Sequence, residues 1–91
     1  MPPVHPGLAL EEILAEHGLG ARDAAVRLGM ARPVLQRLLA GQQRMSAEMA
    51  LRLRRLCGNG PEIWLNLQAH YDVALARQRH GAGLEAVEPL V

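Results

Sequence analysis

The stretch from Gly20 to Gly41 constrains the fold of this 91-residue chain more than any other part of the sequence. Its apolar residues recur at helical spacing in two short runs, which predict one helix over residues 21–28 and another over residues 32–40. Gly29 separates the two runs, and glycine readily takes the positive φ at which a helix ends. Two short helices joined by so tight a turn are the layout of a helix-turn-helix, in which the second helix enters the major groove of DNA.

An ordinary helical hairpin would show a similar pattern, so the stretch alone leaves two alternatives open. The distribution of charge favours DNA binding. Residues 20–59 contain eight arginines against Asp23 and Glu48, a net charge of +6, whereas residues 1–19 carry −3 and residues 60–91 carry −2. The helix-turn-helix pattern therefore lies in the basic part of the chain, as phosphate binding requires. The alternative is a solvated polar face whose acidic partners lie elsewhere by chance.

The rest of the sequence predicts three further helices, and hence an all-α fold of five. The first runs from Pro6-Gly7 to about His17, the fourth from the N-cap Ser46 to about Cys57, and the fifth and longest from Pro61 to about Arg79. We expect a single helix-turn-helix domain over residues 1–91, ending in a tail over residues 80–91.

The predicted fifth helix carries apolar side chains on two sides, so it needs cover on two sides. One side would close the core of the domain, and the other would meet a second copy of the chain or another partner. The residues assigned to this dimer or partner interface are Ile63, Trp64, Leu67, Tyr71 and Leu75. The alternative is that the tail, with its apolar residues Leu84, Val87, Leu90 and Val91, folds back over the helix.

No catalytic constellation is visible in the sequence. The four histidines form no paired metal motif such as H-E-x-x-H, and the single cysteine, Cys57, permits no disulfide within the chain. We therefore expect no enzymatic activity, no cofactor and no metal. No segment approaches the roughly 20 apolar residues of a membrane span, and Glu11 and Glu12 interrupt the N-terminal apolar region, so we expect a soluble, cytoplasmic protein.

Longer motifs give a resemblance to a known family. His5-Pro6-Gly7 opens the chain, and the fifth helix contains Trp64-Leu65-Asn66-Leu67-Gln68 followed by Tyr71-Asp72. Together with the helix-turn-helix, these motifs resemble the HigA/VapI-type antitoxins, which are lambda-repressor-like (XRE) helix-turn-helix proteins. The resemblance covers about residues 5–79, and its most specific part is the segment Trp64 to Ala76.

The resemblance implies a function. An antitoxin of this kind belongs to a type II toxin–antitoxin module, where it binds and neutralises a HigB-like toxin, a ribonuclease of RelE-like fold that cleaves messenger RNA. It also represses its own operon as a dimer on a palindromic operator. The implied partners are therefore double-stranded DNA, the toxin and a second copy of the chain. A stand-alone dimeric regulator and a protein-interaction module with weak DNA affinity remain alternatives.

The resemblance also assigns DNA-binding positions. The recognition helix begins at Ala31-Arg32-Pro33, and its base-reading positions are Arg32, Pro33, Gln36 and Arg37. Arginine can pair bidentately with guanine and glutamine with adenine. The positions facing phosphate are Arg22 at the start of the preceding helix and the loop residues Gln42, Gln43 and Arg44. Alanines at positions 21, 31 and 40 replace polar residues frequent in the family, so we expect binding to depend on the arginines at 32, 37 and 44.

Overall fold

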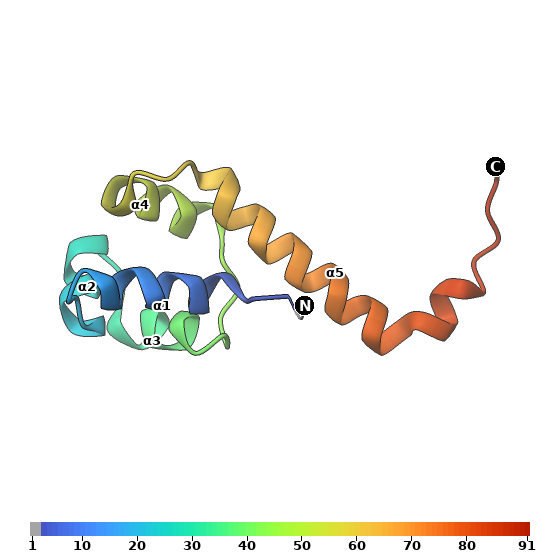
Figure 1. Ribbon diagram of the computed structural model, residues 1–91, viewed down its shortest axis with the longest axis horizontal. Helices are drawn as coiled ribbons and strands as arrows, with labels where there is room; N and C mark the ends of the chain where they lie inside the picture. The colour runs from blue at the N-terminus through green and yellow to red at the C-terminus, as the bar shows by residue number, and fades with distance from the viewer. Residues whose placement is uncertain (1–2) are drawn as a thin grey trace.

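The computed structural model describes residues 3–91, which form five α-helices and no strand (Figure 1). The helices are α1 Pro6–Glu16, α2 Ala21–Leu28, α3 Arg32–Leu39, α4 Ala47–Cys57 and α5 Pro61–Glu85. Helices α1 to α4 pack around one core, and α5 leaves it as a long arm that carries the C-terminus away from the other helices. The prediction of an all-α fold of five helices with a long C-terminal helix is confirmed.

Helices α2 and α3 form where the sequence predicts them. Gly29 ends α2 at φ +66°, and the N–H of Met30 donates to the Ala25 carbonyl at 3.0 Å, which closes the end of the helix. Helix α3 then begins at Arg32 and ends at Leu39, one residue before the predicted end. The two helices pack against each other through their apolar faces, so the turn geometry and the packing agree.

The core contains apolar side chains from all five helices and from the segment before α4. Its buried members are Leu10, Leu14, Ala24, Ala25, Leu28, Leu35, Leu38, Met45, Ala50, Leu53 and Trp64. Apart from Met45, each lies on the inward face of an amphipathic helix. Helix α5 joins this core mainly through its first turns, where it packs against α4.

Trp64 corrects one of the predicted interface assignments. Its side chain is only 1% exposed and is the largest that is fully buried, so it belongs to the core rather than to an interface. The cause is the phase of α5. Trp64 and Gln68, one turn apart, both face inward, whereas the adjacent Ile63 is 53% exposed.

Helices α1 and α3 approach each other closely at Gly7. A Cβ atom built on Gly7 would overlap the backbone carbonyl of Leu38 in α3. Because no side chain intervenes, the start of α1 lies directly on the α3 backbone, and Leu10, one turn later, reaches the core with 0% exposure.

The end of the chain differs from the prediction. Helix α5 does not end near Arg79 but continues to Glu85, with non-helical backbone angles at His80 (φ −126°, ψ 16°). Beyond it the chain lies away from the other helices (Figure 1), and Val87 and Leu90 are exposed, as is Leu84 near the end of α5. The tail therefore does not fold back over α5, and the alternative that it covers the second side of this helix is wrong.

Candidate nucleic-acid interface

Helix α3 presents a polar face to the outside. Arg32, Pro33, Gln36 and Arg37 are all exposed, and they recur one turn apart, opposite the buried Leu35 and Leu38. Within residues 3–91, neither Arg32 nor Arg37 pairs with an acidic side chain. The structure therefore brings the four predicted base-reading side chains together on one open surface with two unneutralised charges.

The first turns of α2 and α3 have backbone donors that no side chain caps. Neither N-cap residue, Gly20 for α2 or Ala31 for α3, supplies a side-chain hydrogen bond to the first turn. The first N–H groups of a helix have no partner within the helix, and they attract anions together with the helix dipole. Arg22, predicted to face phosphate, is exposed in the first turn of α2. The alanine and glycine caps thus leave these donors free for an external acceptor.

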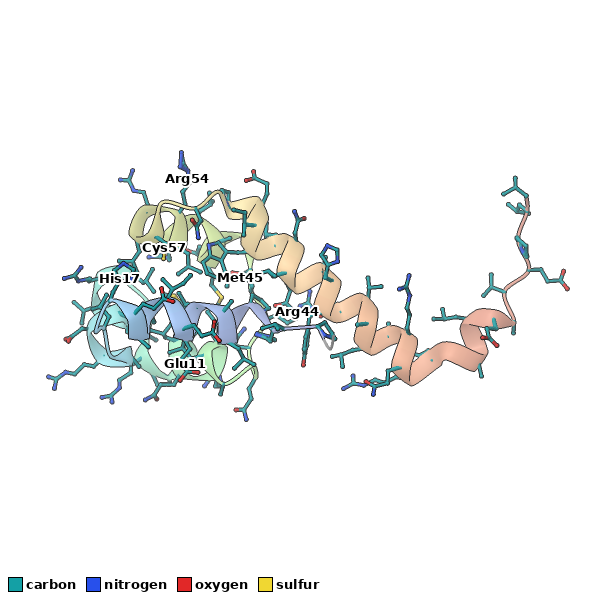
Figure 2. The ribbon with its side chains drawn as sticks, in the orientation of Figure 1. Glu11, His17, Arg44, Met45, Arg54 and Cys57 are labelled. Carbon is teal, nitrogen blue, oxygen red and sulfur yellow. The ribbon has the colours of Figure 1, made fainter. Side chains whose placement is uncertain are left out.

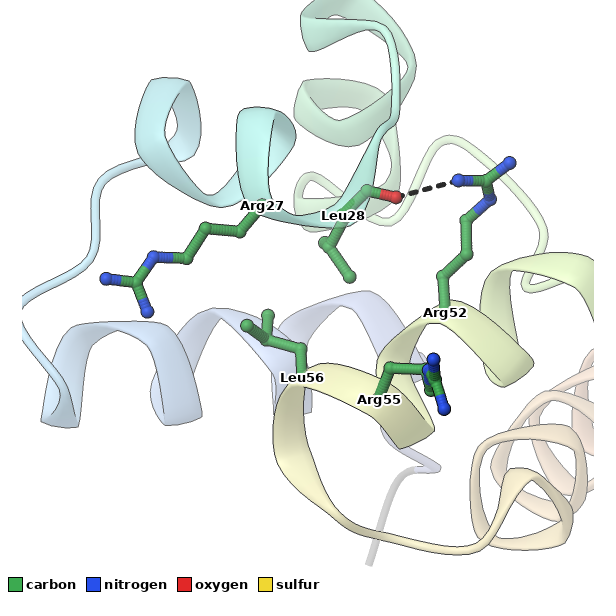
Figure 3. Close-up of a pocket in the computed structure, with 5 residues that line it drawn as sticks. All are labelled: Arg27, Leu28, Arg52, Arg55 and Leu56. Carbon is green, nitrogen blue, oxygen red and sulfur yellow. Dashed lines mark hydrogen bonds between the residues drawn. The ribbon is translucent and has the colours of Figure 1, made fainter.

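Arg52 in α4 fastens the turn of the helix-turn-helix, a role that periodicity does not reveal. Its Nη1 donates to the carbonyl oxygen of Leu28 at 2.9 Å (Figure 3) and to that of Gly29 at 3.4 Å. Its Nη2 donates to Glu48 Oε1 at 3.1 Å. A charged donor therefore satisfies the carbonyls at the end of α2 and ties this helix to α4.

We expect Arg52→Ala to lower the free energy of unfolding by about 1–2 kcal/mol, because the last carbonyls of α2 lose a charged donor that is only partly exposed to water. Urea denaturation followed by circular dichroism measures the change. Arg54→Ala is the matched control, since Arg54 is exposed on the same helix, and it should alter stability by less than about 0.5 kcal/mol. Equal midpoints for the two variants would contradict this role of Arg52.

The loop between α3 and α4 is tied to α5 by a chain of polar contacts. The Gln68 side chain is only 4% exposed; its Oε1 accepts the Met45 N–H at 2.7 Å and its Nε2 donates to Asp72 Oδ1 at 3.0 Å. Asp72 Oδ2 accepts from Arg44 Nη1 at 2.6 Å, and Figure 2 shows Arg44 beside α5. The predicted phosphate contact Arg44 thus already has a carboxylate partner. Its neighbours Gln42, exposed, and Gln43, half-buried, are not part of this chain of contacts.

The ionised form of Asp72 is favoured in this arrangement. Burial by itself raises the pKa of the carboxyl, but the hydrogen bonds from Arg44 and Gln68 and the positive charge of Arg44 outweigh burial, so the pKa lies below its usual range. Asp72 is therefore a carboxylate at neutral pH and a full ionic partner for Arg44.

His5 joins the start of α1 to the same region. Its Nδ1 accepts the Gly7 N–H at 2.9 Å as the N-cap of α1, and its ring lies edge-on to Tyr71 with centroids 5.0 Å apart. Burial lowers the pKa of His5, and the charge of Asp72 and a backbone hydrogen bond with Gln43 only partly oppose this. The neutral ring is the form that accepts from Gly7. We call the meeting place of His5, Arg44, Gln68, Tyr71 and Asp72 the loop–α5 junction.

The other residues predicted to form an interface on α5 divide between two environments. Ile63 is exposed, whereas Leu67, Tyr71 and Leu75 are half-buried, and Leu67 packs against the core. Val73, which the sequence analysis did not assign, is 50% exposed. The apolar surface that α5 leaves open to a partner therefore lacks Trp64 and includes Val73.

Residues 3–91 offer little for other kinds of chemistry. No three side chains among His, Cys, Asp and Glu in this range are grouped so that they could hold a metal ion. Cys57 lies half-buried at the end of α4, where burial raises the pKa of its thiol. None of the described helices combines the length and apolar character needed to cross a membrane.

Two short helices joined at a left-handed glycine, with a basic exposed second helix, define a helix-turn-helix protein of the kind that regulates transcription. The chain is 38% identical over 79 residues to virulence-associated protein I of Dichelobacter nodosus, covering 86% of this chain and 73% of that protein. It is 33% identical over 89 residues to antitoxin HigA-1 of Vibrio cholerae, covering 97% of this chain and 84% of that protein. The chain belongs to the HigA/VapI family of antitoxins, which are helix-turn-helix regulators and not enzymes.

Solved structures agree with this fold over nearly the whole chain. An addiction module antidote protein of the HigA family from Coxiella burnetii matches with a TM-score of 0.91 at 36% identity, covering 98% of this chain and 99% of that one. Pseudomonas aeruginosa antitoxin HigA with the higBA promoter matches with a TM-score of 0.92 at 33% identity, covering 98% of this chain and 99% of that one. Antitoxin GraA in complex with its operator matches with a TM-score of 0.91 at 41% identity, covering 100% of this chain and 94% of that one. No family model matches the chain.

Proposed function

We propose that this protein is the antitoxin of a type II toxin–antitoxin module and that it represses its own operon by reading operator DNA with α3. The observation that carries the proposal is the open polar face of α3, where Arg32 and Arg37 have no acidic partner within residues 3–91. The Pseudomonas aeruginosa HigA–promoter complex and the GraA–operator complex support it, because both proteins share the fold throughout.

In this proposal α3 lies in the major groove. Arg32 and Arg37 donate bidentately to guanine, Gln36 pairs with adenine, and Pro33 makes apolar contact with a base edge. The free N–H groups at the start of α2, together with Arg22, hold the phosphate backbone and fix the register of the helix. Gln42 and Gln43 extend the backbone contact from the loop after α3.

The protein acts as a homodimer in this proposal, because a palindromic operator requires two recognition helices about 34–36 Å apart. The exposed apolar side chains Ile63 and Val73, with the half-buried Leu67, Tyr71 and Leu75, support α5 as the dimer or partner surface. Trp64 is excluded from this surface by its burial. Sedimentation velocity of the full chain measures the association, and a monomer at micromolar concentration would contradict the dimer.

The proposed second partner is a HigB-like toxin of RelE fold that cleaves messenger RNA. Helix α1 offers it an acidic surface, since Glu11, Glu12 and Glu16 are exposed and the helix contains no arginine or lysine (Figure 2 shows Glu11). A ribonuclease that cleaves messenger RNA on the ribosome is expected to be basic, so the charges are complementary. Rescue of growth when the antitoxin is co-expressed with the neighbouring gene product tests this role. A stand-alone regulator would give no rescue.

The DNA-binding proposal is tested by titrating the purified full chain onto a duplex of its own upstream region and onto a scrambled duplex at two salt concentrations. We expect binding to both duplexes to weaken with salt, with the upstream duplex bound at least about 1,000-fold more tightly, as in specific recognition. Equal affinities for the two duplexes at both salt concentrations would contradict operator reading and leave a protein-interaction module as the better interpretation.

A further inference from the structure

We propose that Asp72 of α5 competes with DNA phosphate for Arg44, so that α5 limits the affinity of the α3–α4 loop for the DNA backbone. The inference rests on the proposed function, because it concerns a loop adjacent to the proposed recognition helix. It assigns to α5 an influence on DNA binding that is separate from its place in the core.

The first line of support is the geometry of the ion pair. Arg44 Nη1 lies 2.6 Å from Asp72 Oδ2, and the Arg44 side chain is 70% exposed while that of Asp72 is 34% exposed. A guanidinium bound to a carboxylate has part of its donor set occupied, and the negative charge beside it offsets its positive charge. A phosphate oxygen approaching the loop therefore meets an Arg44 whose positive charge is offset by Asp72 and whose Nη1 is already engaged.

The second line of support is that the loop backbone is held independently of this ion pair. Gln68 is buried, and it accepts the Met45 N–H at 2.7 Å, next to Arg44 in the chain. Gln68 also donates to the other carboxylate oxygen of Asp72, which fixes the carboxylate in place. The loop and Asp72 are thus fixed, whereas the long Arg44 side chain can exchange one anionic partner for another.

The third line of support is the environment of the pair. Exposed ion pairs are weakly stabilising, so a phosphate oxygen can compete with a carboxylate for the same guanidinium. Arg79, His5 and Gln42 line the same shallow hollow, and Asp72 is the one acidic residue among its lining side chains within residues 3–91. Removing this single carboxylate therefore leaves a cationic loop surface, with Arg44 and Arg79 unopposed in the hollow.

The test measures affinity for the scrambled duplex as a function of salt for the wild type and for Asp72→Asn. Asparagine keeps an oxygen that can accept from Gln68 but loses the charge that holds Arg44. We expect Asp72→Asn to bind about threefold to tenfold more tightly at low salt, with a log–log salt slope steeper by about 0.9, the value for one additional phosphate contact. A thermal melt of each variant verifies that the fold is retained.

Two further variants identify the cause. In the double variant Arg44→Ala/Asp72→Asn the gain should vanish, because Arg44 is the group released. Glu62→Gln removes one negative charge from the exposed start of the same helix, away from the junction, and it should leave the slope unchanged.

Several results would overturn the inference. The first is an Asp72→Asn affinity equal to or weaker than that of the wild type, which includes the case in which neither protein binds detectably. The second is a gain in affinity that persists in the double variant without Arg44. The third is an equal gain in affinity in Glu62→Gln. Failure of the proposed function would be seen in a separate comparison. The wild type would then bind the upstream and scrambled duplexes with equal affinity, whatever the effect of Asp72→Asn.

Discussion

The variant Gly7→Ala is expected to lose about 3 kcal/mol or more of folding free energy, a large part of the roughly 5–14 kcal/mol that stabilises a domain of this size. The added Cβ would overlap the backbone carbonyl of Leu38, and a backbone atom in the last turn of α3 cannot move aside as a flexible side chain can. Helix α1 would have to separate from α3 and open the core between Leu10 and Leu35, both fully buried.

Urea denaturation followed by circular dichroism measures this effect, and Gly83→Ala is the matched control. Gly83 lies in α5, where an added Cβ meets nothing within 4 Å, so alanine should raise stability slightly, by up to about 1 kcal/mol, through its higher helix propensity. A Gly7→Ala variant as stable as the wild type to within about 1 kcal/mol would show that α1 and α3 can separate without loss of core packing.

Gly7 also illustrates what the sequence could and could not predict about the fold. Local signals predicted the five helices, because proline at the start of α1, serine before α4 and glycine after α2 each act within one helical turn. The close contact of Gly7 with Leu38 joins two helices that are far apart in the chain, and nothing in the local pattern marks it. The resemblance included His5-Pro6-Gly7, and the structure explains these residues as a cap, a first-turn proline and a helix-crossing contact.

The fifth helix was the least predictable part of the fold. Apolar residues on two sides indicated a need for cover, but they did not determine which side faces the core. The structure resolves this through Trp64 and Gln68, which face inward together, and a buried glutamine cannot be inferred from apolar periodicity. The end of α5 was also misjudged, since Gly81 and Gly83, assigned to the tail after the helix, lie in the helical turns after the break at His80.

The candidate site divides in the same way. The exposed positions of α3 follow from helical spacing, because residues opposite a buried apolar stripe must face outward. Neither the contact of Arg52 with the end of α2 nor that of Arg44 with Asp72 follows from spacing, because each joins residues more than 20 positions apart. Charge placed these arginines in one basic segment, and the resemblance assigned Arg32, Arg37 and Arg44 to DNA. The structure separates one arginine that fastens the turn, one paired with α5 and two that are open to a ligand.

The double charge reversal Arg32→Glu/Arg37→Glu is expected to abolish operator binding, with a loss of at least about 1,000-fold. Each bidentate contact to a base contributes about 1–3 kcal/mol of discrimination, and a carboxylate facing the groove adds repulsion from phosphate. Both residues are exposed and have no acidic partner within residues 3–91, so the protein should keep its fold and its melting temperature. Titration of the upstream and scrambled duplexes measures the affinity for each and the ratio of the two affinities.

Arg54→Glu/Arg55→Glu makes the same change in net charge on α4 and serves as the control. Both residues are exposed, and Figure 2 shows Arg54 pointing away from the side on which α3 lies. This control should weaken binding to both duplexes by a similar, modest factor, because it alters only the long-range electrostatic field of the protein. The ratio of the affinities for the two duplexes should therefore stay unchanged. If both double variants had the same effect, the arginines of α3 would act only through net charge, and α3 would not be the helix that reads the operator.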